Sequence, residues 1–293
     1  MNIQHPVTTP LIENTNLSST DNHLQHLFSC FNKSSSSGRK RMLSFHQILG
    51  FLACKQKYSC NTWLGLHRCL VDNGYMLPHY SNFLKTIKLS IRFLLLLIDY
   101  VVSINKHIFL QKQFKVALVD STCLPVCHIK RSSRHKTMKK SACYSKSTMG
   151  WYYGHKLHVT CDYETQDIID YEFSMANLDD RKYLASILTD ESKFKNIGSL
   201  FVCDKGYQAK WLQELAIETN NYLLSGEKKS KNNKTLASLF DIHLLHVRAR
   251  IESVFSTLKV NHNLTNTRSR SVLGYLFNYT LALYGVVCCK SQD

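Results

Sequence analysis

The pattern of apolar and polar residues changes near residue 113. Before that point, apolar residues recur at helical spacing in three segments, 42–56, 60–74 and 81–104. Leu77-Pro78 separates the second segment from the third, because a residue that precedes proline disfavours helical geometry. We therefore expect an all-helical domain over residues 41–112.

After residue 113 the spacing becomes that of short strands alternating with helices. The expected strands are 114–120, 150–163, 167–174, 199–204 and 221–226. The expected helices are 181–188, opened by Asp179 and Asp180, then 208–219, 243–262 and an apolar C-terminal helix. This order predicts an α/β fold, a mixed sheet with flanking helices, over residues 113–293.

Residues 1–40 are polar and end in NKSSSSGRKR, so we expect a flexible basic tail there. In the helical domain, short helices joined by tight turns suggest a helix-turn-helix DNA reader, with residues 77–88 as the candidate recognition region. A helical bundle that only packs on the next domain is an equal alternative.

Two apolar stretches need to be tested as membrane spans. Residues 93–98 are too short to cross a bilayer, and Asp99 is expected to end the run. Residues 272–289 are uncharged, but their polar and small side chains favour a buried C-terminal helix. The N-terminus has no basic and then apolar leader, and the 11 cysteines are scattered without close pairs. We expect no membrane partner, and reduced thiols in the cytoplasm.

The charge balance indicates the kind of partner. The chain has 37 Lys and Arg against 21 Asp and Glu, a net charge of +16, and a pI near 9.3. Such a balance favours a polyanion, either a nucleic acid or an anionic membrane surface, and we favour nucleic acid. A hydrophobic content of 44% is enough for a folded core.

Two expected strands end on a carboxylate. Asp120 follows the apolar run of the first strand, and Asp204 follows that of the fourth. Side chains at the ends of central strands face the crevice where ligands bind, and hard divalent cations prefer carboxylate oxygens. The alternative is that each aspartate only caps a turn or a following helix.

A third carboxylate lies in the expected late helix. On a continuous α-helix, Arg248, Glu252 and Lys259 would lie within ~40° of one stripe. A carboxylate between two cations suits metal binding beside an anionic strand. A solvated, salt-bridged face is the alternative.

The segment 121–161 contains no Asp or Glu and interleaves basic with aromatic residues. We predict a DNA track here, because cations bind the backbone and aromatic rings stack on unpaired bases. A solubilising loop with core aromatics is the alternative. The basic residues are Lys130, Arg131, Arg134, Lys136, Lys139, Lys140, Lys146 and Lys156, and the aromatic residues are Tyr144, Trp151, Tyr152 and Tyr153.

Together these segments resemble the DDE transposases of bacterial insertion sequences, most closely those of the insertion sequence 982 family. The resemblance covers roughly residues 113–285, and the helical N-terminus is similar in length and texture to that family's DNA-binding region. Related transposases often carry Tyr three residues before the motif Arg, where this chain has Leu245. The motifs that carry the resemblance are VDST, MGWYYGHKLH, CDKGY, LPVCHIKR, ANLDDRKYL and Arg248-x3-Glu252-x6-Lys259.

The resemblance implies a ribonuclease-H-like fold in which the first and fourth strands lie side by side and a late helix brings the glutamate to them. The family's metal-binding, catalytic carboxylates fall on Asp120, Asp204 and Glu252. They would hold two Mg²⁺ or Mn²⁺ ions ~4 Å apart. Lys205 would lie near phosphate, and Arg248 and Lys259 would contact DNA or order the glutamate.

The implied reaction is cleavage at terminal inverted repeats, followed by strand transfer through attack of a DNA 3′-hydroxyl on target DNA. The implied partners are double-stranded DNA of the element ends and target and at least one further copy of the chain, in the bacterial cytoplasm at the nucleoid. Three alternatives remain: a sequence-specific DNA-binding regulator, a Mg²⁺-dependent nuclease without strand transfer, and an inactive copy of the transposase.

Overall fold

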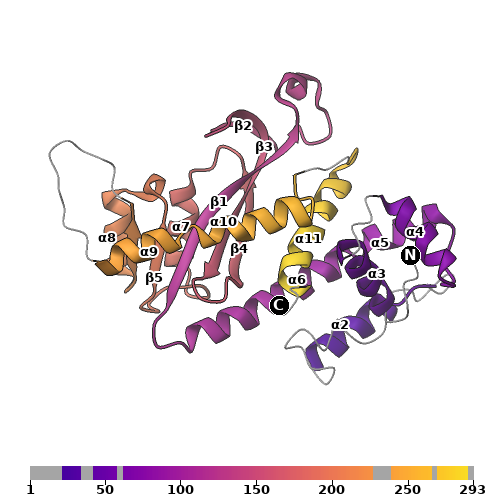
Figure 1. Ribbon diagram of the computed structural model, residues 1–293, viewed down its shortest axis with the longest axis horizontal. Helices are drawn as coiled ribbons and strands as arrows, with labels where there is room; N and C mark the ends of the chain where they lie inside the picture. Colours follow the sequence, from indigo (N-terminus) through magenta and orange to yellow (C-terminus); the bar gives the residue numbers. More distant parts are fainter. Residues whose placement is uncertain (1–21, 34–41, 58–61, 227–238, 266–268, 290–293) are drawn as a thin grey trace. The chain divides into compact units, whose positions relative to one another are not determined.

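The computed structural model describes residues 22–33, 42–57, 62–226, 239–265 and 269–289. The chain forms two compact units. We call Met1–Val101 with Thr257–Asp293 the helical unit, and Val102–Ser256 the sheet unit. The C-terminal residues thus group with the N-terminal helices, whereas the sequence pattern had joined them to the sheet. Figure 1 follows the chain through its elements.

The helical unit is built from amphipathic helices. Helix α11 contacts α3 and α5, and the Tyr284 hydroxyl donates a hydrogen bond to the Leu49 carbonyl at 3.4 Å. The helical composition expected for the N-terminal region is confirmed. The elements of this unit are α2 (Asn22–Lys33), α3 (Phe45–Lys57), α4 (Trp63–Asp72), α5 (Tyr80–Leu89), the first half of α6 (Ile91–Leu110), the π-helical turn η3 (Thr257–Asn261) and α11 (Val272–Cys288).

The prediction of an unstructured tail over residues 1–40 is wrong at α2. Phe31 lies 4.9 Å from Phe45 and 5.0 Å from Phe93 between ring centroids, and Phe28 lies 5.6 Å from Phe45. Two phenylalanines three residues apart lie on one face of a helix, so this polar segment still has an apolar face to bury. The remainder of the expected tail lies outside the described residues.

The third expected helix is two helices, α5 and α6, divided at Ser90. The Ser90 hydroxyl donates to the Ile87 carbonyl at 2.7 Å, a local bond that competes with helix continuation.

The links on either side of α5 differ in length. Residues 73–79 join it to α4, which is longer than the turn of about three or four residues in a helix-turn-helix. A DNA-reading role for residues 77–88 stays a prediction.

Helix α6 runs through Asp99, as the helical segment 81–104 predicts, and ends at Leu110. Asp99 is exposed, where a charge does not interrupt a helix. By length and composition α6 is the one helix in the described residues that could cross a membrane, with a mean hydropathy of 1.7 over 18 residues. This is weak support for a span, because a soluble protein's core helix passes the same test.

The sheet unit contains a six-stranded mixed sheet (Figure 1). The strand order is β2-β3-β1-β5-β6, and β4 also pairs with β3. β1 is antiparallel to β3 and parallel to β5, which is parallel to β6. The first and fourth expected strands therefore lie side by side, as in a ribonuclease-H-like fold, and the predicted fold class is confirmed. The strands are β1 (Val116–Cys127), β2 (Cys143–Ser147), β3 (Gly150–Asp162), β4 (Ile168–Met175), β5 (Leu200–Cys203) and β6 (Tyr222–Ser225).

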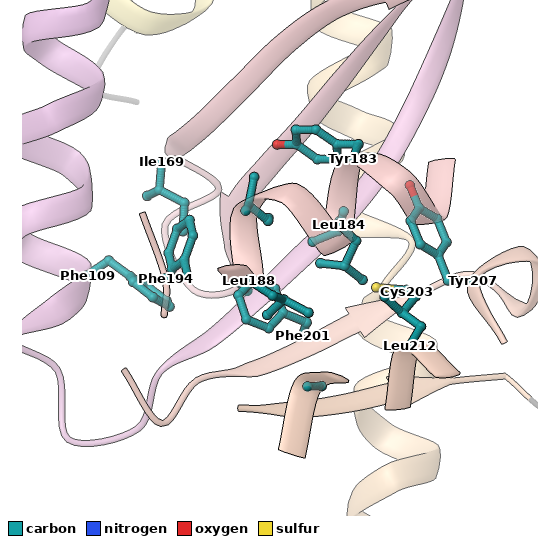
Figure 2. Close-up of a cluster of buried hydrophobic side chains, with 14 residues drawn as sticks. Phe109, Ile169, Tyr183, Leu184, Leu188, Phe194, Phe201, Cys203, Tyr207 and Leu212 are labelled. Carbon is teal, nitrogen blue, oxygen red and sulfur yellow. The ribbon is translucent and has the colours of Figure 1, made fainter. Parts of the chain in front are cut away.

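Helices α7 (Asp180–Thr189) and α8 (Lys210–Glu218) cover one face of this sheet. Leu184 and Leu188 of α7 lie beside Phe201 and Cys203 of β5 (Figure 2), and the ring of Tyr183 stacks on that of His158 of β3 at 4.7 Å. As expected, aspartates open α7, because the Asp179 carboxylate accepts a hydrogen bond from the Arg181 amide at 3.0 Å. Alternation along β1 places Ala117 and Val119 in this core, so Leu118 and Asp120 point to the opposite face. There α10 (Arg250–Ser256) contacts β1.

Candidate active site

Asp120 and Asp204 lie at the same level of two adjacent parallel strands. The last residues paired between β1 and β5 are Val119 and Cys203, and each aspartate follows directly. Because Val119 and Cys203 both face the core, both aspartates leave the sheet on the opposite face. Backbone pairing alone therefore brings together the two carboxylates that are separated by 84 positions in the sequence.

The expectation that Asp120 ends its strand is wrong. β1 continues to Cys127, since its antiparallel pairing with β3 extends beyond its parallel pairing with β5. Asp120 is therefore inside a strand, where it caps no helix. Asp204 precedes the short 3₁₀ turn η2 (Lys205–Tyr207), and in this described segment its side chain makes no capping hydrogen bond. Capping does not explain either carboxylate.

The two carboxyl groups have different surroundings. Burial raises the pKa of Asp120 to about 6, and the negative charges of Asp204 and Asp180 act in the same direction. A hydrogen bond from the Ser121 amide at 2.8 Å and the charge of Arg248 oppose that rise. The Asp204 side chain is 47% exposed. One carboxylate is thus destabilised by burial beside a second that is open to solvent.

Arg248 supplies the positive charge nearest to this pair among the ion pairs of the described residues. Its Nη2 atom lies 3.9 Å from Oδ1 of Asp204. Arg248 occupies the turn between α9 (Leu239–Val247) and α10, and its amide donates to the Leu244 carbonyl at 3.0 Å. The prediction that Arg248 serves the acidic site fits this position.

The single helical stripe expected for Arg248, Glu252 and Lys259 is wrong. Arg248 lies in a turn, α10 spans only Arg250–Ser256, and the chain then enters the π-helical turn η3, where the His262 amide donates to the Thr257 carbonyl at 3.2 Å. The angle of ~100° per residue assumed for one α-helix does not hold across these breaks. Lys259 also belongs to the helical unit, whereas Glu252 belongs to the sheet unit.

Glu252 lies in the first turn of α10 and is exposed. Within the described residues, no group of three or more His, Cys, Asp or Glu side chains is close enough to hold a metal ion. The Asp120 and Asp204 carboxylates fit a divalent cation, because they offer oxygen ligands and because their negative charge is only partly balanced by Arg248. The structure does not bring Glu252 into a three-carboxylate cluster with them, so its role stays a prediction.

Asp180 is a further acidic neighbour that the sequence pattern did not assign to the site. The Lys156 ammonium lies 3.0 Å from its Oδ1 atom and also donates to the Leu178 carbonyl at 2.9 Å. Nδ1 of His158 lies 3.8 Å from the same carboxylate oxygen. Lys156 is therefore largely buried in an ion pair, unlike the exposed cations of the same segment, and its place in the DNA track stays a prediction. The spacing of Lys156 and His158, two apart on β3, was the available signal that both share one face.

The other predicted DNA-contacting cations are at the surface. Figure 1 shows the segment between β1 and β2 projecting beyond the end of these strands. It contains the 3₁₀ helix η1 (Ile129–Arg134) and leads into the hairpin of β2 and β3. Their binding role stays a prediction. The exposed cations are Lys130, Arg131, Arg134, Lys136, Lys139, Lys140 and Lys146, with Lys205 beside Asp204 in η2.

Paired aspartates on the central strands of a mixed sheet suit divalent cations, which many enzymes that act on phosphate esters use. The chain belongs to the DDE transposase family, because residues 110–272, more than half of its length, match the family described as "Transposase DDE domain". It is therefore a DDE transposase. Enzymes of this family use divalent metal ions, which agrees in general terms with the metal expected from the resemblance.

Two solved structures of another transposase, Mos1, are similar to the chain. One is a pre-cleavage transpososome, with 12% identity, a TM-score of 0.23, and coverage of 88% of this chain and 83% of that chain. The other is a paired-end complex with the left transposon end, with 10% identity, a TM-score of 0.22, and coverage of 89% and 84%. At these TM-scores the likeness does not bear on the arrangement of this chain. No curated protein sequence matches it.

Proposed function

We propose that this transposase cleaves DNA at the terminal inverted repeats of an insertion sequence and joins the released 3′ ends to target DNA. Its partners are double-stranded DNA of the element ends and target, bound by a homodimer or larger assembly. The proposal extends to a bacterial element of the insertion sequence 982 type, with the protein acting in the cytoplasm at the nucleoid.

The observation that supports this function best is the level placement of Asp120 and Asp204 on adjacent strands. Holding two carboxylates together costs free energy unless a cation compensates their charge, and the raised pKa of Asp120 reflects part of that cost. Arg248 provides only partial compensation, because it lies 3.9 Å from Asp204 and contacts the exposed partner of the pair. Bound metal cations would compensate the rest of the negative charge, and we propose two Mg²⁺ or Mn²⁺ ions.

Divalent ions bound there would activate water or a DNA 3′-hydroxyl and stabilise charge on the leaving oxygen. The chain's own residues have simpler roles in this proposal. Asp120 and Asp204 hold the ions, and Glu252 completes the set from the first turn of α10. Arg248 limits repulsion between the carboxylates, and Lys205, exposed in the turn after Asp204, contacts a phosphate. Lys259 contacts DNA from the helical unit.

The test is an assay of purified protein with a plasmid that carries its gene and several hundred flanking base pairs, with Mg²⁺ or with EDTA. We expect Mg²⁺-dependent cuts at inverted repeats and joined products, both lost in Asp204→Asn. Glu214→Gln is the matched control, because Glu214 is a surface carboxylate on α8 whose partner, Lys210, is also exposed. Its activity should equal that of the wild type.

The same assay separates the alternatives. Metal-dependent cutting without joined products would indicate a nuclease that does not transfer strands. Sequence-specific binding without cutting would indicate a regulator or an inactive copy, and would contradict the proposed reaction.

A further inference from the structure

The aromatic residues of the basic segment are of two kinds. Tyr152 and Tyr153 are buried, and Tyr153 is only 6% exposed. Trp151 is 63% exposed and Tyr144 is 51% exposed. Tyr144 still packs its ring on that of Tyr153, whereas Trp151 is the most exposed tryptophan in the described residues and is open to a binding partner.

Trp151 and Tyr144 lie on the same face of the β2–β3 hairpin. Lys146 pairs directly with Trp151, and Tyr144 pairs directly with Tyr153. Residues opposite each other, and residues two apart on one strand, share a face, so these four side chains form one row. We call Tyr144, Lys146, Trp151 and Tyr153 the hairpin face.

The inner half of the hairpin face is held firmly. The ring of Tyr144 lies 4.8 Å from that of Tyr153, and the Tyr144 hydroxyl donates to Oγ of Ser132 at 2.9 Å. Ser132 belongs to η1, so the projecting segment is fastened to the hairpin. The outer half, Lys146 and Trp151, is exposed. The row therefore offers an aromatic surface whose base is already ordered, which lowers the entropic cost of binding.

The positive charge around the hairpin face indicates which kind of ligand it binds. Lys130, Arg131 and Arg134 are exposed on η1, which is joined to this face through Ser132. No Asp or Glu occurs between Ser121 and Cys161. A surface that combines cations with exposed aromatic rings suits a strand that carries phosphates and accessible bases. In a paired duplex the base faces are stacked on one another and cannot stack on a side chain.

We infer that the hairpin face binds unpaired bases of a DNA strand, with Trp151 stacking on a base and the neighbouring cations contacting the backbone. This inference deepens the proposed function, because it specifies the form of the DNA that the enzyme holds beside its acidic pair. It assigns Trp151 to substrate binding, and it does not require Trp151 to take part in phosphoryl transfer.

The experiment measures binding of the full chain, in EDTA, to three probes of equal length. They are a single strand, a duplex, and a duplex with a short internal unpaired stretch. We expect Trp151→Ala to weaken binding to the two probes with unpaired bases by about 5- to 100-fold, the range for loss of one stacked base. Duplex affinity should change less than twofold, and Trp151→Phe should recover most of the loss.

Two controls isolate stacking. Trp211→Ala removes another exposed tryptophan of the sheet unit, 46% exposed on α8, and should leave all three affinities unchanged. Replacing the unpaired bases with abasic sugars should weaken wild-type binding and abolish the difference between wild type and Trp151→Ala. The salt dependence of binding should be the same for Trp151→Ala and wild type, since stacking releases no counterions.

Equal weakening of all three probes by Trp151→Ala, or no weakening of any, would overturn the inference. Dimerisation that Trp151→Ala abolishes without affecting base binding would overturn it in favour of a contact between copies of the chain. Because EDTA prevents metal-dependent cutting, the result does not depend on the proposed reaction, and either proposal can fail alone.

Discussion

The strands around Asp120 and the segment that carries Glu252 differ in what fixes their side chains. Asp120 and Asp204 are placed by backbone hydrogen bonds between adjacent strands, which set their level and face to the residue. Glu252 lies on a seven-residue helix between a turn and a π-helical turn. Sheet register thus fixes two carboxylates of the candidate site, whereas the short helix α10 does not bring Glu252 into a cluster with them in the described residues.

The largest expected effect on cleavage comes from neutralising a carboxylate of the strand pair, Asp204, or the carboxylate of α10, Glu252. Asp204→Asn should reduce Mg²⁺-dependent cleavage by about 10³-fold or more, because groups that act as one catalytic unit fail together. Glu252→Gln should cause a loss of similar size if Glu252 completes the same site. Cleavage rates under single-turnover conditions measure both.

A Glu252→Gln enzyme that retains near wild-type cleavage, while Asp204→Asn is inactive, would break the comparison. Glu252 would then be a surface residue, and the third ligand would have to be sought elsewhere. Glu214→Gln controls for loss of a negative charge from the sheet unit.

The next effect concerns the exposed cations of η1, beyond the aspartate pair. Removing Lys130, Arg131 and Arg134 together should weaken DNA binding by about 10- to 100-fold at moderate salt. The slope of log affinity against log salt should fall by about 0.9 for each phosphate that the variant no longer neutralises. Binding titrations at several salt concentrations measure this.

The control removes Lys182 and Lys210, two exposed lysines on α7 and α8, and the two variants are compared per cation removed. An equal loss of slope in that control would mean that net charge, and not the position of the η1 cations, determines binding.

A third effect tests the cost of burying Asp120. Because its pKa in the folded chain is raised to about 6 from an ordinary value of 3.8, the folded state binds more protons than the unfolded state between these values. The charged carboxylate therefore reduces stability most above pH 6, and the reduction fades as pH falls toward 4. Asp120→Asn should raise the free energy of unfolding by about 1–3 kcal/mol at pH 7.5 in EDTA, and by less at pH 5.

Chemical denaturation at the two pH values measures this difference. A variant that is less stable than wild type at pH 7.5 would show that Asp120 stabilises the fold, and would remove the argument that its charge awaits a cation. With Mg²⁺ present the gain should shrink, because a cation stabilises only the wild-type carboxylate.

The smallest effect sharpens the role of Arg248. Its charge holds down the pKa of Asp120, so Arg248→Ala should raise that pKa. The acidic limb of the pH–rate profile should move to higher pH. Arg181→Ala is the control, because Arg181 pairs with Asp179 at 2.5 Å. An unchanged profile in Arg248→Ala would contradict the electrostatic role.

The sequence predicts the elements whose pattern is local and regular. Alternating or continuous apolar runs identified β1, β3, β4, β5 and β6, and Asp179 marked the start of α7. Helix α2 was missed although Leu24, Leu27, Phe28 and Phe31 recur at helical spacing, because the polar residues of 1–40 outweigh this short apolar stripe in the composition of the segment. Strand β2 was missed because its residues alternate between exposed and half-buried positions, with no apolar run. One continuous helix was expected where α10 meets η3, since hydrophobic spacing does not reveal a change from α to π geometry.

In the candidate site too, features that follow from a local sequence pattern were predicted and features that depend on tertiary contacts were not. Asp120 and Asp204 were identified because a charge directly after an apolar run is unusual, and their pairing follows from strand order. The ion pair between Lys156 and Asp180 depends on how the start of α7 packs beside β3, a tertiary contact that no local pattern encodes. For that reason the sequence did not indicate that Lys156 is largely buried in an ion pair.

The length of β1 sets a distance along DNA. The strand runs from Asp120 to Cys127 with a register shift between Pro125 and Cys127, and Cys127 pairs with Tyr153 at the inner end of the hairpin face. Seven residues at about 3.3 Å each separate these positions by about 23 Å. A DNA strand advances about 3.4 Å per nucleotide, so this span corresponds to about seven nucleotides. Trp151 lies two residues farther along β3 than Tyr153, which adds about 7 Å. If the scissile phosphate lies at the aspartates, the base that stacks on Trp151 should lie about nine nucleotides away, and a single abasic position moved along the strand would locate it.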